Sequence, residues 1–151
     1  MSEKKRRVLS TVLICLCIAT VAFIWGNSML GSKASSNVSN SVLGALDPII
    51  RRFGIVSKDD LWLRKLAHFT EFAALGAELL FLAAVRRRLG LQAASNCAFA
   101  ALLAALTDET IQLISGRNSQ VRDVLLDFSG ALTGILIAWL ICRLIKKRRA
   151  I

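Results

Sequence analysis

Four long hydrophobic segments, separated by polar or basic stretches, dominate the chain. They cover residues 8–25, 61–85, 91–114 and 121–145. An α-helix of about 20 mostly apolar residues crosses the hydrocarbon core of a bilayer, so each segment is long enough to span it. The pattern predicts an all-α integral membrane protein: a bundle of four transmembrane helices forming a single domain over residues 1–151.

The connection between the first two segments changes character along its length. Serine and asparagine residues fill its first part, from Asn27 to Ser41, as in a turn-rich loop. Over residues 38–53, apolar residues then recur at helical spacing opposite polar and charged ones. This pattern favours a short helix lying in the membrane interface. The alternative is a loop that covers the bundle and binds no ligand.

Composition supports the membrane assignment and limits the class of function. With 55% hydrophobic residues and a mean hydropathy of +0.57, the 151-residue chain is too apolar for a soluble domain of its size. The net charge is +10, but the basic residues gather at the ends of hydrophobic segments, which argues against nucleic-acid binding. The four cysteines form no metal-binding spacing and are interpreted as small apolar side chains.

Basic residues also predict the orientation in the membrane. Twelve of the 20 Lys and Arg residues lie at residues 4–7, 86–88 and 143–149, and eight lie on the opposite side. Because loops rich in Lys and Arg stay in the cytoplasm, both termini of this multi-pass protein are predicted to be cytoplasmic.

Ionisable and polar residues interrupt three of the hydrophobic segments at their predicted outer ends. Burying an unpaired charge in a bilayer costs roughly 2.5–3.5 kcal/mol even on lenient scales, so these residues are expected to face one another in a pocket. Together with the loop before the last segment, they give the predicted ligand-binding residues: Arg64, Lys65, His68, Glu71, Asp108, Glu109, Gln112, Arg117, Ser119, Asp123 and Asp127.

The last segment also carries a glycine pair on the face that bears its carboxylates. Gly130 and Gly134 continue the helical face of Asp123 and Asp127. A Gly-xxx-Gly pair lets another helix backbone approach closely, so this face is predicted to be packed against protein instead of lipid.

Three ordered motifs resemble the VanZ-like membrane protein family, and the resemblance extends from Trp25 to Gly134. They read Arg64-Lys65-x-x-His68-Phe69-x-Glu71-Phe72-x-x-Leu75-Gly76, Thr107-Asp108-Glu109-x-x-Gln112 and Gly116-Arg117-x-Ser119-x-x-x-Asp123-x-x-x-Asp127-x-x-Gly130. The resemblance implies a bacterial plasma-membrane protein. Some members of that family are associated with low-level resistance to teicoplanin or related glycopeptides.

Three functions remain open at this level. The first is an envelope protein whose pocket binds a cell-wall precursor or a glycopeptide, with the lipid bilayer as its other partner. The second is an intramembrane enzyme acting on an envelope or lipid-linked substrate, with His68, Glu71, Asp108 and Glu109 as catalytic candidates and a divalent metal such as Mg²⁺ or Mn²⁺ as cofactor. The third is a structural or assembly role, in which these groups only pair across helices.

Overall fold

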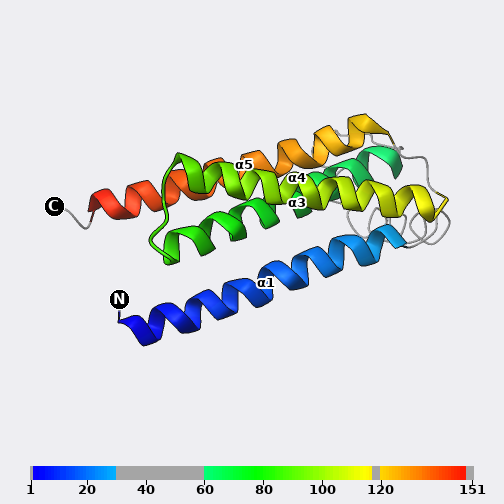
Figure 1. Cartoon of the computed structure of the whole chain (residues 1–151). Helices are drawn as coiled ribbons and strands as arrows, with labels where there is room; N and C mark the ends of the chain where they lie inside the picture. Colours follow the sequence, from blue (N-terminus) through cyan, green and yellow to red (C-terminus); the bar gives the residue numbers. More distant parts are fainter. Residues whose placement is uncertain (1, 30–59, 117–119, 149–151) are drawn as a thin grey trace, which may run out of the picture.

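The computed structural model describes residues 2–29, 60–116 and 120–148, and these residues form an elongated bundle of helices (Figure 1). The helices are α1 (Glu3–Met29), α3 (Asp60–Val85), α4 (Leu91–Ile114) and α5 (Val121–Arg148). All four are long and apolar enough to cross a membrane, which confirms the predicted all-α membrane bundle. The predicted interfacial helix over residues 38–53 lies outside the described residues.

Helix α1 is longer than its apolar run at both ends. At its start, Glu3 pairs with Arg6 at 3.0 Å and with Arg7 at 3.8 Å, in the i,i+3 and i,i+4 positions that stabilise a solvated turn. At its other end, Asn27 and Ser28 form part of the last turn instead of the predicted polar connection. Ser28 is fully buried there because α4 supplies its hydrogen-bond partners.

Helices α3 and α5 form the most extensive helix pair of the bundle. Three glycines make it close: a Cβ added to Gly76, Gly130 or Gly134 would overlap a backbone carbonyl oxygen of the facing helix, that of Ala131, Phe69 or Ala73 respectively. The prediction that the glycine face of the last segment packs against protein is therefore confirmed.

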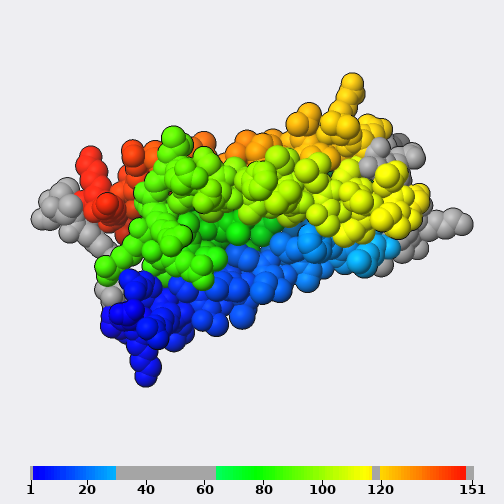
Figure 2. Space-filling view, in the orientation of Figure 1, coloured from blue at the N-terminus to red at the C-terminus, as the bar shows by residue number. Residues whose placement is uncertain are grey.

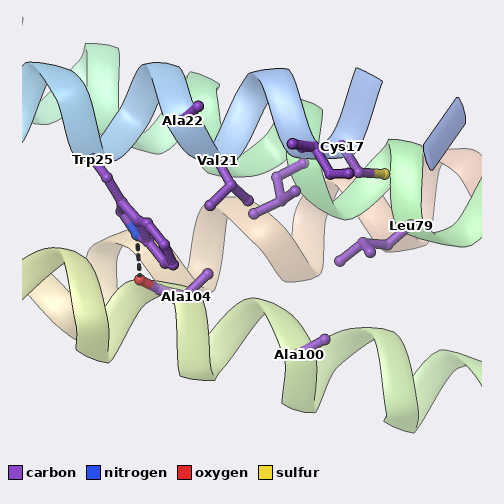
Figure 3. Close-up of a pocket in the computed structure, with 9 residues that line it drawn as sticks. Cys17, Val21, Ala22, Trp25, Leu79, Ala100 and Ala104 are labelled. Carbon is purple, nitrogen blue, oxygen red and sulfur yellow. Dashed lines mark hydrogen bonds between the residues drawn. The ribbon is translucent and has the colours of Figure 1, made fainter. Parts of the chain in front are cut away.

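Helix α1 packs against α3 and α4 and lies along one side of the bundle (Figure 2). The Trp25 indole N–H donates to the carbonyl oxygen of Ala104 at 3.4 Å, and Thr20 donates to the Glu78 carboxyl group at 3.0 Å. A largely apolar pocket of about 350 Å³ lies between the three helices, lined by Cys17, Trp25 and Leu79 among others (Figure 3). These contacts fix α1 against α3 and α4. They place its last turn at the end of the bundle where the polar residues of the other helices lie.

Candidate functional site

The polar residues of α3, α4 and α5 meet at one end of the bundle. The first turns of α3, the last turns of α4 and the first turns of α5 all lie at this end, together with the end of α1 (Figure 1). The start of α1, the end of α5 and the basic turn at residues 86–88 lie at the other end. We call the following residues the polar cluster: His68, Glu71, Asp108, Glu109, Gln112, Asp123 and Asp127.

The centre of the polar cluster is a histidine between carboxyl groups. His68 Nδ1 lies 3.9 Å from Glu71 Oε2, one helical turn away, and 3.8 Å from Asp108 Oδ2 on α4. Asp108 is fully buried and Asp127 is 1% exposed, whereas the His68 side chain keeps 16% of its surface. The site is thus an ionisable centre that lies inside protein but is not completely closed.

Amide and hydroxyl groups from α4 and α1 hold the buried carboxyl groups in place. Gln112 Nε2 donates to Asp108 Oδ2 at 2.7 Å, and the same amide lies 3.4 Å from Ser28 Oγ. The Asn27 side chain hydrogen-bonds to the Glu71 carboxyl group. Helix α1 therefore supplies two polar side chains to the site.

The turn leading into α5 also contributes to the site. Helix α4 ends at Ile114, and Gly116 follows with φ +74, a left-handed conformation that commonly ends helices. The backbone N–H of Gln120 then donates to Glu109 Oε1 at 2.6 Å. This bond ties the start of α5 to the end of α4.

Cationic side chains lie nearer the surface than the carboxyl groups. Lys65 Nζ pairs with Asp123 Oδ1 at 3.0 Å, and the lysine side chain is 49% exposed against 26% for the aspartate. Arg64 is half-buried and Arg122 is exposed. The described part of the site therefore has an acidic interior and a cationic rim.

Three of these residues come from three different helices and converge on one point. His68, Asp108 and Asp127 each offer one ligand atom, and these atoms lie within 4.8 Å of one another. Imidazole nitrogen and carboxylate oxygen can exchange protons, and together they can ligate a divalent metal ion.

The structure thus brings eight of the predicted site residues to one end of the bundle, namely Lys65 and the polar cluster. Arg64 lies on the same turn of α3 as Lys65, but no contact among the described residues joins it to the polar cluster. The other two predicted site residues, Arg117 and Ser119, lie outside the described residues. Three contributors were not predicted: Asn27, Ser28 and the Gln120 N–H. The available signal for the first two was a pair of polar residues directly after the first apolar run.

Comparison with known proteins supplies the family. The family model described as VanZ/LLP1 matches residues 8–143, which is most of the chain. Neither a curated protein nor a solved structure matches it. The chain belongs to the VanZ/LLP1 family, which confirms the resemblance seen in its motifs.

Proposed function

We propose that this VanZ/LLP1 family protein resides in the bacterial plasma membrane and lowers susceptibility to teicoplanin-type glycopeptides by engaging an envelope component at the outer side of the membrane. The observation that carries the proposal is the gathering of the polar cluster and its cationic rim at the end of the bundle remote from the basic turn, the start of α1 and the end of α5. By the positive-inside rule, that end faces outward.

The layering of charge supports binding over a purely structural role. Interhelical polar contacts in membrane proteins average only about 0.6 kcal/mol where they have been measured, so stability is a weak reason to bury this many carboxyl groups. The exposed Lys65 and Arg122 side chains suit an anionic partner, because ammonium and guanidinium groups form charge-assisted hydrogen bonds with carboxylates and phosphates. Cell-wall precursors carry such groups.

A susceptibility assay tests the proposal. Teicoplanin inhibition is compared in a sensitive bacterium that carries an empty vector, the wild-type gene, Glu71→Gln or Asp123→Asn, with equal protein in the membrane fraction. The matched control is Glu78→Gln, which alters the same type of side chain two turns further along α3, outside the polar cluster. We expect the wild type and Glu78→Gln to raise the inhibitory concentration and the two cluster variants to lose that effect.

Two results would contradict the proposal. If the wild type protects no better than the vector, this chain has no role in glycopeptide susceptibility. If both cluster variants protect as well as the wild type at equal abundance, the polar cluster is not where the envelope component acts.

The orientation has its own test. Green fluorescent protein or alkaline phosphatase is fused after Ile151 and, separately, within the turn at residues 86–88. Because fluorescent protein folds in the cytoplasm and phosphatase is active outside it, we expect fluorescence and no phosphatase activity at both positions. The opposite pattern would place the polar cluster on the cytoplasmic side and exclude an outer binding site.

A second candidate function is acid–base catalysis on a lipid-linked envelope substrate. The position of His68 between two carboxyl groups, 3.9 and 3.8 Å away, favours it, because a neighbouring carboxyl group helps an imidazole to accept and return a proton. Lipid extracts of cells expressing the wild type or His68→Gln are compared by mass spectrometry. A product found only with the wild type supports catalysis, whereas identical lipid profiles argue against it.

A further inference from the structure

We infer that His68, Asp108 and Asp127 form a binding site for a divalent transition-metal ion. The inference concerns the polar cluster but does not depend on glycopeptide susceptibility, because it is tested on the purified protein. It rests on geometry, on an uncompensated buried carboxyl group and on the supporting hydrogen bonds.

The geometry is close to that of a formed site. Ligand atoms that lie on opposite sides of one ion are about 4.2 Å apart when each bond is about 2.1 Å long. The three ligand atoms already lie within 4.8 Å of one another. Ligand atoms that are not opposite each other lie about 3.0–3.4 Å apart, so side-chain shifts of up to about 1 Å bring all three to bonding distance.

Asp127 supplies the independent reason to expect a cation. Asp127 is only 1% exposed, so it is about 99% buried. One of its carboxyl oxygens lies within 4.8 Å of the ligand atoms of His68 and Asp108. Among the described residues, none donates a hydrogen bond to it or forms an ion pair with it. A buried carboxylate in this condition carries a large desolvation penalty unless it takes up a proton or positive charge lies against it, and a bound cation is what would keep it ionised.

Neighbouring charges make the deficit larger. The carboxyl groups of Glu71, Asp108, Glu109 and Asp123 all lie within electrostatic range of Asp127. Among the described residues, one lysine or arginine forms an ion pair with this cluster: Lys65, which pairs with Asp123 at the rim. A doubly charged ion at the centre neutralises the interior in a way that the rim lysine does not.

A hydrogen bond orients one of the three ligands, and a backbone contact fixes the helices that carry the other two. Gln112 donates to Asp108 Oδ2 at 2.7 Å, as outer hydrogen bonds typically do for metal-binding carboxylates. On the other side, Gly130 and Phe69 touch backbone to backbone, which fixes α5 against α3 one turn from Asp127 and beside His68. Ligands held in this way need little reorganisation to bind an ion.

The donor set selects the class of metal. One imidazole nitrogen with carboxylate oxygens suits Mn²⁺, Fe²⁺ or Zn²⁺ better than Ca²⁺, which prefers oxygen ligands alone. Three protein ligands leave further positions on the ion for water or for an anionic group. The His68 side chain is 16% exposed, so the site can be reached from outside the protein.

Metal binding is measured on the full chain purified in detergent and stripped with a chelator. Mn²⁺ is added, and the amounts of bound and free ion are determined by electron paramagnetic resonance, which distinguishes them by their signals. We expect one Mn²⁺ per chain, displacement of Mn²⁺ by Zn²⁺, and a rise in melting temperature with Mn²⁺. Asp127→Asn and His68→Gln should each weaken binding by at least about tenfold, and Gln112→Ala should weaken it within the roughly 10–100-fold range of outer-shell changes.

The control is Glu78→Gln, which alters a membrane-embedded carboxyl group outside the site and should bind Mn²⁺ as the wild type does. Asp127→Asn keeps the size of the side chain, and its helical circular dichroism and gel-filtration profile establish that it is folded. No stoichiometric Mn²⁺ or Zn²⁺ on the wild type would overturn the inference. Wild-type affinity in folded Asp127→Asn and His68→Gln would also overturn it, since the ion would then lie elsewhere. Metal binding without any antibiotic phenotype would support this inference while contradicting the proposed function.

Discussion

Replacing Gly134 with alanine should separate the two helices that hold the site together. A Cβ at this position would overlap the carbonyl oxygen of Ala73 and would also crowd its carbonyl carbon and Cα. All three atoms belong to the backbone of α3, so no side-chain end can swing away to make room. One helix must move relative to the other.

The size of the effect follows from two costs and one gain. Overpacking typically costs about 1–3 kcal/mol, and a backbone clash belongs at the upper end of that range. A gap of about 0.5–1 Å elsewhere along the interface also forfeits a quarter to a half of each affected dispersion contact. Alanine returns about 1 kcal/mol of helix propensity. The net expectation is a loss of about 2 kcal/mol in the free energy of unfolding.

The assay is unfolding by sodium dodecyl sulfate in mixed micelles, followed by tryptophan fluorescence and circular dichroism. Gly26→Ala is the matched control, because a Cβ at Gly26 of α1 meets no heavy atom within 4 Å. Its stability should stay equal to the wild type or rise by up to about 1 kcal/mol. If Gly134→Ala unfolds at the same denaturant fraction as Gly26→Ala, the close approach of α3 and α5 is refuted.

Three further predictions use the same unfolding titration. Thr20→Val removes the hydroxyl group that donates to Glu78 at 3.0 Å, and a double-mutant cycle with Glu78→Leu, which removes the acceptor, should give a coupling of about 0.6–1.7 kcal/mol; a coupling of zero would mean that the bond contributes nothing. Ser28→Ala should cost about 1 kcal/mol because the fully buried hydroxyl group lies against the Gln112 amide, and an unchanged midpoint would contradict that contact. Lys65→Met should change stability by less than about 1 kcal/mol, since its pair with Asp123 is 49% exposed on the lysine side; a larger loss would show that the rim pair is structural.

Hydrophobic length and periodicity were enough to predict the helices and the packed glycine face. Segments of this length and apolarity have few alternatives to a membrane helix, and a glycine pair on the same face as two aspartates indicates where a neighbouring helix lies. The same spacing predicted that His68, Asp108 and Asp127 share one end of the bundle, and they do.

The depth of each carboxyl group could not be predicted in this way. Asp123 and Asp127 share one face of α5, one turn and about 6 Å apart. That small rise separates an aspartate paired with lysine at the rim from one that is 1% exposed in the interior. Helical spacing alone does not say at which turn the neighbouring helices close over the site.

The end of α1 was mispredicted for a related reason. Asn27 and Ser28 follow Gly26, a composition typical of a turn, so the helix was expected to stop before them. Tertiary contacts override that local preference: Gln112 lies against the Ser28 hydroxyl group, and Ser115 donates to the Ser28 carbonyl oxygen at 3.0 Å. Partners that lie more than 80 residues away in the chain leave no local pattern by which to find them.

Packing and charge oppose each other at the level where α3 meets α5. In a bilayer, helices gain no hydrophobic free energy by associating, so close van der Waals contact at Gly130 and Gly134 supplies much of the attraction. The same contact brings His68 of α3 and Asp127 of α5 together and draws the carboxyl groups of the polar cluster toward one another. The carboxyl groups are close enough to repel one another, and to share one positive charge, only while the helices are packed. A cation bound there would therefore stabilise the folded bundle as well as occupy the site, because it would bind the packed state and not the separated helices.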